Sequence, residues 1–239
     1  MIKRTITIVA VLGLILALPG VAMAQTATTT QQATRRIEAV KDRALQSIDN
    51  RLDTIKRLRF HLDNGHATAD HAATLTADLD QAEAGLNDLA GQIRSATTLE
   101  ELRVLVPQIA TEFRIYVVIA PKTLEVATAD TILWAVDNPL TRVHDKLADI
   151  IDRAFNAGYD VSEAQAALQD MQAHMTQVEA HASPVPGQVI GLQASDWENP
   201  AKALLDQGHD KLLQAREELL AARVSANAAG DALRAALNG

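Results

Sequence analysis

The feature that most constrains this chain is a repeat of apolar residues at alternating three- and four-residue spacing, which places one apolar stripe along a helix face. The stripe is unbroken over residues 72–96 and again over residues 205–236. Its members are Ala72, Leu75, Leu79, Ala82, Leu86, Leu89, Ile93 and Ala96 in the first segment, and Leu205, Gly208, Leu212, Ala215, Leu219, Ala222, Ala226, Ala229, Leu233 and Ala236 in the second. We therefore expect an all-α fold, an elongated antiparallel helical bundle with coiled-coil-like heptad packing.

Weaker copies of the pattern predict further helices near residues 45–62, 140–157 and 164–182, which gives about six helices in one domain, residues 34–239. Turn and cap residues mark the ends of these helices. Asn64-Gly65 and Ala157-Gly158 each end a helix, and Thr68 is a predicted N-cap. The next helix is capped by Thr97 with Glu100 or by Thr98 with Glu101, and Ser162 with Gln165 forms a capping box. A faint repeat at an offset of 95 residues leaves two interpretations open, duplication of a helical hairpin or chance likeness between hairpins.

The middle of the chain is predicted to form a helix buried at the centre of the bundle. Residues 113–119 are β-branched and aromatic enough for a strand, but helical spacing of apolar residues continues through them, so we expect a helix that is apolar on all sides. Pro107 and Pro121 should kink this helix, and Asn138-Pro139 should end it. The irregular loop 183–199 should pack across an end of the bundle.

The first 24 residues predict a secretory signal peptide. Lys3 and Arg4 precede an uncharged apolar stretch over residues 6–18, and Ala22-Met23-Ala24 supplies the small residues of a cleavage site. The apolar stretch is shorter than the ~20 residues that span a bilayer. We therefore expect cleavage after Ala24, a secreted or periplasmic protein, no stable membrane span after cleavage, and a disordered lead-in at residues 25–33.

Composition and charge exclude several classes of function. The chain has no Cys, which excludes disulfides, zinc–thiolate sites and catalytic thiols. Its formal charge of −8 argues against a nucleic-acid partner, because a protein that binds nucleic acid needs a basic face.

Residues 31–63 carry 8 bases and 5 acids, whereas residues 64–112 carry 2 bases and 8 acids. We interpret this asymmetry as pairing between a basic first helix and an acidic second one; the alternative is a basic patch that binds anionic envelope polymers or lipid headgroups. The basic residues concerned are Arg51, Lys56, Arg57 and Arg59.

The sequence contains no established catalytic motif. A nucleophile elbow, a Walker A loop, a dinucleotide fingerprint, a zinc-protease helix and an EF-hand loop are all missing. We therefore expect no enzyme activity and no cofactor.

Two groups of side chains are candidates for binding a metal ion. The first combines thioether and imidazole, a ligand set that suits Cu(I), although Met at stripe positions is more often core filler. It consists of Met171, His174, Met175 and His181. The second lies around the turn between the first two predicted helices. Its histidines are five residues apart and would face different sides of a continuous helix. The alternative is that they are exposed histidines that bind no metal. It consists of His61, Asp63, His66, Asp70 and His71.

Two resemblances accompany this pattern. The stretch TEFRIYVVIAPK at residues 111–122, with TLEEL before it and VSEAQAALQDM after it, resembles uncharacterised bacterial secreted all-helical proteins over most of the mature chain. That resemblance implies no activity, cofactor or site residue. The element VSEAQ at residues 161–165 is similar to the L-T-x-x-Q element of the Spy/CpxP-like periplasmic chaperones, with Val and Ser in place of Leu and Thr.

Two functions follow from these observations. The first is a non-enzymatic exported helical protein, a structural or protein-interaction module of the cell envelope, which contacts a protein partner or a second copy through its helical faces. Leu204, Leu213 and Leu220 widen the apolar face of the last helix and motivate it. The alternative is a periplasmic stress chaperone of the holdase type, or a metal-binding protein.

Overall fold

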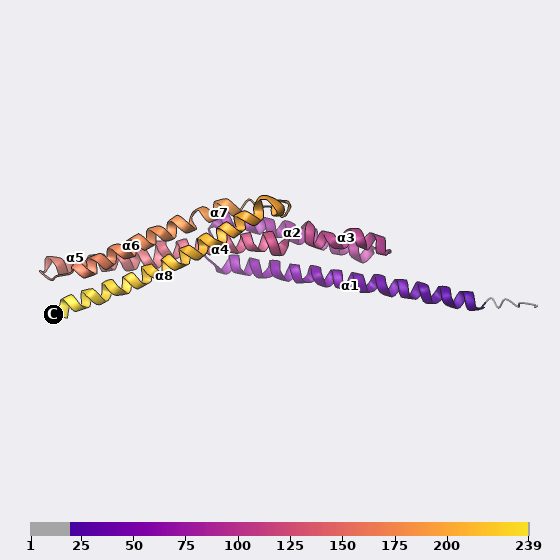
Figure 1. Cartoon of the computed structure of the whole chain (residues 1–239), viewed down its shortest axis with the longest axis horizontal. Helices are drawn as coiled ribbons and strands as arrows, with labels where there is room; N and C mark the ends of the chain where they lie inside the picture. Colours follow the sequence, from indigo (N-terminus) through magenta and orange to yellow (C-terminus); the bar gives the residue numbers. More distant parts are fainter. Residues whose placement is uncertain (1–19, 239) are drawn as a thin grey trace, which may run out of the picture.

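The computed structural model describes residues 20–238, which form an elongated all-α fold without strands in that range (Figure 1). The predicted fold class is confirmed, but the described part has five long helices instead of about six. They are α1 (Gly20–Asn64), α2 (Ala69–Ser95), a central helix over residues 99–156, α6 (Ser162–Ala182) and α8 (Lys202–Asn238).

The central helix explains the lower count. It joins α3 (Leu99–Thr111), the π-helical turn η1 (Ile115–Ile119), α4 (Ala120–Ala135), a second π-helical turn η2 (Val136–Leu140) and α5 (Thr141–Asn156). The prediction that Asn138-Pro139 ends a helix is wrong, because both residues lie within η2. A wider π turn accommodates the missing N–H of proline, and the Thr141 hydroxyl donates to the Val136 carbonyl at 2.8 Å.

Of the segment that could have formed a strand, Ile115–Ile119 is helical, as predicted, whereas Phe113 and Arg114 lie outside the flanking helices. Its irregularity lies at Arg114, which has a left-handed φ of 39° between α3 and η1. The two prolines predicted to kink the helix lie within α3 and in the first turn of α4, where Pro121 needs no backbone hydrogen-bond donor.

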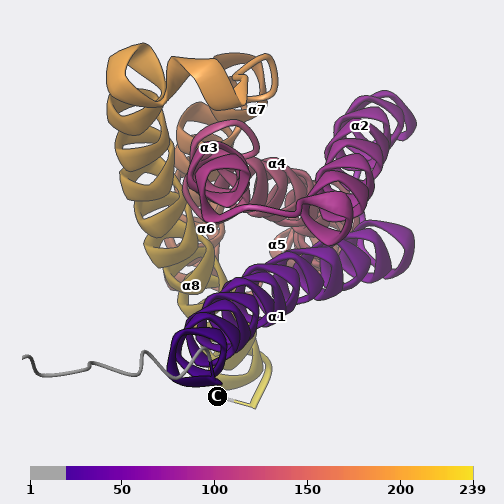
Figure 2. The same cartoon turned by 90° about the vertical axis from the view of Figure 1, so that its right-hand side faces the viewer.

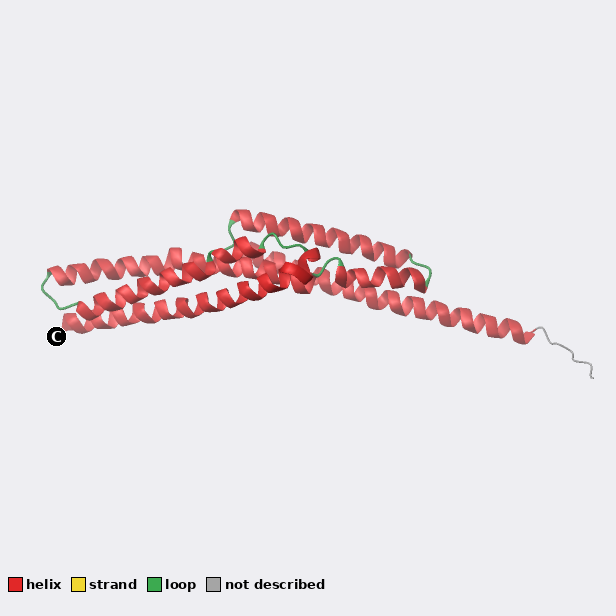
Figure 3. Cartoon of the chain, turned by 45° about the horizontal axis from the view of Figure 1, so that its top comes forward, coloured by secondary structure: helices red, strands yellow, loops and turns green. Residues whose placement is uncertain are grey.

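The central helix joins two halves of the molecule. α1, α2 and α3 lie at one end, and α5, α6 and α8 run side by side at the other (Figures 1 and 3). Between them α4 contacts α1, α2, α6, α8 and the short helix α7 (Pro184–Val189). Figure 2, seen from the end at which α1 begins, shows α4 between α2 and α8. Most sides of α4 near its middle therefore face another element, whereas Leu124 stays exposed.

The predicted apolar stripes form the core. In α2 the residues Leu75, Leu79, Leu86 and Ile93 are fully buried, and in α8 Ala215 and Ala222 are fully buried. A smaller separate cluster closes the far end of the α5, α6 and α8 half. It consists of Ile151, Ala154, Val161, Ala164 and Leu233.

The predicted helix boundaries are mostly confirmed. α1 ends at Asn64, the Thr68 hydroxyl accepts the His71 N–H at the start of α2, and Gly158 follows α5 with a φ of 92°. The capping box predicted at Ser162 is wrong. Ser162 is already in the first turn of α6, and its N–H is accepted instead by the Asp160 carboxylate at 3.1 Å.

The basic first helix does pair with the acidic second helix. The Arg59 guanidinium in α1 forms ion pairs with Asp80 and with Glu83 of α2, and the Lys41 ammonium donates to the Arg94 carbonyl at 3.0 Å. Lys56 pairs with Asp53 within α1, and the Arg51 guanidinium lies over the Tyr116 ring of η1.

Residues 1–19 of the predicted signal peptide lie outside the described residues, so its cleavage stays a prediction. Residues 25–33, for which we predicted disorder, are drawn as part of α1. Residues 183–199 include α7, a 3-10 turn η3 (Ala194–Asp196) and the start of a π-helical turn η4 (Trp197–Ala201). This segment packs against α4 and α8.

One helix in the described part of the chain is long and apolar enough, by length and composition alone, to cross a membrane. It is the central helix, Leu99–Asn156. In this fold it packs against the other helices along its length.

Candidate functional site

We had predicted that the middle of the central helix is apolar on all sides, and this prediction is wrong. α4 carries four buried polar or charged side chains, Lys122, Thr123, Glu125 and Asp130. Successive residues of a helix point in directions about 100° apart, so these side chains face different neighbours. Burying charged groups is expensive unless each finds a partner, so their contacts determine what this region can do.

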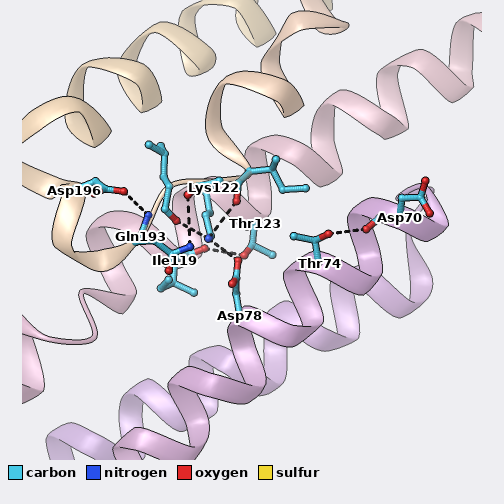
Figure 4. A network of polar contacts seen from close by, with 11 residues as sticks. Asp70, Thr74, Asp78, Ile119, Lys122, Thr123, Gln193 and Asp196 are labelled. Carbon is cyan, nitrogen blue, oxygen red and sulfur yellow. Dashed lines mark hydrogen bonds and ion pairs between the residues drawn. The ribbon is translucent and has the colours of Figure 1, made fainter.

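Lys122 is fully buried and has three acceptors. Its Nζ atom lies 2.6 Å from Oδ2 of Asp78 in α2, 2.6 Å from the Leu192 carbonyl and 3.4 Å from the Ile190 carbonyl (Figure 4). An ammonium group has three N–H donors, and here each has an acceptor. Lys122 therefore joins α2, α4 and the segment after α7, and it is not free to act as a base or nucleophile.

A cavity lies beside this ion pair. It has a volume of about 350 Å³ and is lined by Asp78, Gln81, Glu112, Phe113, Gln193 and Ser195 among others. The wall is held in place by local hydrogen bonds, since the Gln193 N–H donates to Asp196 at 2.8 Å. The Phe113 ring covers Gly85, where a side-chain Cβ would collide with it.

Asp130 anchors the turn between α1 and α2. It is 4% exposed, its Oδ2 accepts the Thr68 N–H at 2.9 Å, and the same oxygen lies 2.9 Å from Nδ1 of His71. One helical turn later, the Trp134 ring stacks on His66 with ring centroids 3.6 Å apart. His66 and His71 thus have separate partners. No group of three or more His, Asp or Glu residues in the described part of the chain is arranged to hold a metal ion.

Glu125 is the buried polar residue of α4 that lacks a partner. It is 8% exposed, and its Oε2 atom is buried with no hydrogen-bond partner. That oxygen lies against Gly208 of α8, where a Cβ atom would overlap it. Burial and, as the smaller cause, the nearby charge of Asp206 together raise the pKa of Glu125 to about 7.

The first predicted metal group, with two methionines and two histidines, lies in α6. Met171 and Met175 are buried in the main core, where they act as packing residues. Nδ1 of His174 lies 2.6 Å from Oε2 of Glu218 in α8, and His181 is half-buried in the last turn of α6. Metal binding by these four residues stays a prediction.

The sequence interpretation missed the three charged residues of α4. Their signal was present, because Lys122, Glu125 and Asp130 are isolated charges in an otherwise apolar helix segment. A charge that interrupts a predicted core helix requires a buried partner, and this requirement could have identified them.

The chain gives no match in the comparisons with known proteins: no family model, no curated protein and no solved structure is similar to it.

Proposed function

We propose that this chain is a non-enzymatic exported helical protein, a structural or protein-interaction module of the cell envelope. The observation that carries the proposal is a row of exposed apolar side chains on α8. Leu213, Leu220 and Val224 are 45%, 60% and 68% exposed. Their spacings of seven and four residues place them on one face of the helix.

This row is surplus to the core of the monomer. The buried stripe of α8 already packs against α6 and α4 through residues such as Leu212 and Ala215. Of the three leucines that we predicted to widen the apolar face, Leu213 and Leu220 are exposed, whereas Leu204 packs against the core. Exposed apolar residues that recur along one helix face are typical of a surface that contacts another protein.

The neighbouring helix α5 adds apolar surface in the same half of the molecule. Its side chains Val143, Ile150 and Phe155 are 42%, 39% and 61% exposed. α5 packs against both α6 and α8. This half of the molecule therefore offers more apolar surface than its own core requires.

The buried polar residues of α4 support a structural role for that region. Lys122 and Asp130 are occupied by Asp78 and by Thr68 and His71, respectively. Such contacts fix the positions of the helices and occupy both Lys122 and Asp130, whereas Glu125 of the same helix has no hydrogen-bond partner for its Oε2 atom. We therefore assign Lys122 and Asp130 to stability and the row on α8 to binding.

The test uses residues 25–239 and two variants. The first, L213S/L220S/V224S, removes the apolar row, and the matched control, Q214S/E217S/R223S, changes exposed polar positions of the same helix. Light scattering measures self-association, and affinity capture from envelope extracts detects binding of a partner protein. We expect association that the first variant loses and the control retains. Equal behaviour of the two variants, or no association of the wild type, would contradict the proposal.

A holdase chaperone is the second candidate, because the same exposed apolar side chains suit an unfolded client. In that case the wild type would suppress aggregation of a reduced client protein and L213S/L220S/V224S would not. A metal-binding role would require Cu(I) to bind with a stoichiometry that M171L/M175L abolishes. These two assays separate the alternatives from the interaction module.

A further inference from the structure

A groove lies between α1 and α3, in the half of the molecule that the proposed function does not use. The two helices pack against each other, and the groove between them has a volume of about 350 Å³. This volume is within the range of about 300 to 1,000 Å³ that is typical of small-molecule sites. Five of its eight lining residues are aliphatic, namely Val40, Ala44, Val106, Ile109 and Ala110.

The polar part of the lining is basic. Arg43, Ser47 and Arg51 of α1 complete the wall, and no Asp or Glu among the described residues lines it. Three other basic residues form the ion pairs of α1 in the described part of the chain, so both arginines of the groove lack a carboxylate partner. A groove with two positive charges and no negative one favours an anionic ligand.

Arg51 is held in place without a counter-charge. Its Nη1 atom donates to the Ser47 carbonyl at 2.9 Å and to the Ser47 hydroxyl at 2.6 Å, and its guanidinium carbon lies 4.9 Å from the centroid of the Tyr116 ring. Its Nε atom is buried and has no hydrogen-bond partner. Native proteins rarely leave a buried donor unpaired, because the loss of hydration is not offset.

The Nη2 group of Arg51 is the part that remains for a ligand. Both printed hydrogen bonds of this side chain use Nη1, and Nη2 is not among the buried atoms without a partner, so it stays accessible. An anion at Nη2 would form a charge-assisted hydrogen bond and balance a guanidinium that the described residues leave uncompensated.

The aliphatic walls determine which kind of anion fits. Val40, Ala44, Ser47 and Arg51 are four, three and four positions apart, so they form one row along α1 that is about 16 Å long. A small inorganic anion would gain nothing from such walls, and an uncharged hydrocarbon would leave Arg51 unbalanced. An alkyl chain with an anionic group at one end satisfies both parts of the row.

We propose that the groove between α1 and α3 binds a free fatty acid, whose carboxylate pairs with Arg51 and whose alkyl chain lies on the aliphatic walls towards Val40. Arg43 is exposed and adds positive potential at the rim. Ile37, one turn before Val40, is partly buried and extends the apolar surface. Since α1 continues past α2 and α3 (Figures 1 and 3), a longer chain would leave the groove along this helix.

Calorimetry with dodecanoate, kept below the concentration at which it forms micelles, tests the proposal. We expect saturable binding to one site per chain. R51Q should weaken this binding by at least about tenfold, and R43Q by a smaller factor, because Arg43 lies at the rim. Dodecan-1-ol has the same chain without the charge and should bind at least about tenfold more weakly than dodecanoate.

The variant A110F tests the walls and leaves every charge in place. Ala110 is exposed and lines the groove, so a phenyl ring there should fill the groove without entering the core, and affinity for dodecanoate should fall by about tenfold. The matched control R57Q removes an exposed arginine of α1 outside the lining and should bind as the wild type does. L213S/L220S/V224S should also bind normally, which separates this site from the row on α8.

Several results would overturn the proposal. No saturable binding of dodecanoate, or equally tight binding of dodecan-1-ol, would remove its basis. Equal loss of affinity in R57Q and R51Q would mean charge attraction only, and normal binding by both R51Q and A110F would place the ligand elsewhere. Binding to phosphatidylglycerol vesicles without binding of monomeric dodecanoate would assign the arginines to a membrane surface. Circular dichroism of each variant confirms that loss of binding is not loss of fold.

Discussion

Lys122 and Asp78 form an ion pair in which the lysine is completely buried, with 2.6 Å between Nζ and Oδ2. The two residues are 44 positions apart in sequence and lie in different helices. Asp78 keeps some access to solvent, since its side chain is 18% exposed. The pair therefore holds α2 against α4 at the junction of the two halves, and its two members should respond differently to substitution.

Removal of the acid should be more damaging than removal of the base. D78A leaves a buried ammonium with two carbonyl acceptors only, which should lower the free energy of unfolding by about 3 to 5 kcal/mol. K122M keeps the aliphatic packing and leaves Asp78 partly hydrated, so we expect a loss of about 1 to 3 kcal/mol. Urea denaturation measures both. The double variant D78A/K122M should be more stable than D78A, and a double variant less stable than D78A would contradict this reading of the pair.

Asp130 should be needed for the turn between α1 and α2. D130A removes the acceptor of the Thr68 N–H and the partner of His71 at once, so the free energy of unfolding should fall by about 1 to 3 kcal/mol. H71A removes only the half-exposed member and should cost less. Hydrogen exchange at the start of α2 localises the effect. Unchanged exchange there in D130A would show that Asp130 does not hold this turn.

Stability should depend on the protonation of Glu125. Its pKa is about 7 in the folded chain against an ordinary value of 4.5, so between these values the folded chain holds a proton that the unfolded chain has lost. The free energy of unfolding must then fall as the pH rises through this window and stay lower above it. Discounted for partial hydration, the contribution is about 1 to 3 kcal/mol.

The variant E125Q isolates this contribution. It should match the wild type at about pH 4.5 and exceed it at about pH 8, because a neutral amide carries no penalty for ionisation. Denaturation at a series of pH values measures the difference. Parallel curves for the two proteins would mean that Glu125 does not titrate in this window.

Two glycines of α8 should respond to alanine with opposite signs. At Gly208 a Cβ would overlap Oε2 of Glu125 and approach a Val185 methyl group, so G208A should destabilise the fold. At Gly230 nothing lies within 4 Å of the new Cβ, so G230A should stabilise the helix by about 0.5 to 1 kcal/mol. Thermal unfolding compares the two. If G208A also raised the midpoint, the close approach of Glu125 to α8 would be refuted.

The parts of the fold that sequence could predict are those encoded locally. The stripe from Leu75 to Ile93 repeats within one helix, and Thr98 with Glu101 forms a capping box within four residues, so both were recognisable. The polar core of α4 was not, because Asp78 sits among other acids of α2 and resembles a solvated residue. Only its distance to Lys122 reveals the pair. The helix through Pro139 was missed for a similar reason, since a π turn has no sequence signature that separates it from a helix end.

Site-specific photo-crosslinking in the native envelope tests the central proposal, that α8 binds a protein through its exposed apolar row. A photoreactive residue replaces Leu213, Leu220 or Val224 in turn, and Glu217 or Arg223 as the matched polar control. We predict one discrete adduct, common to the three apolar positions and much weaker at the two controls. No adduct above the controls at any of the three positions would contradict the proposal.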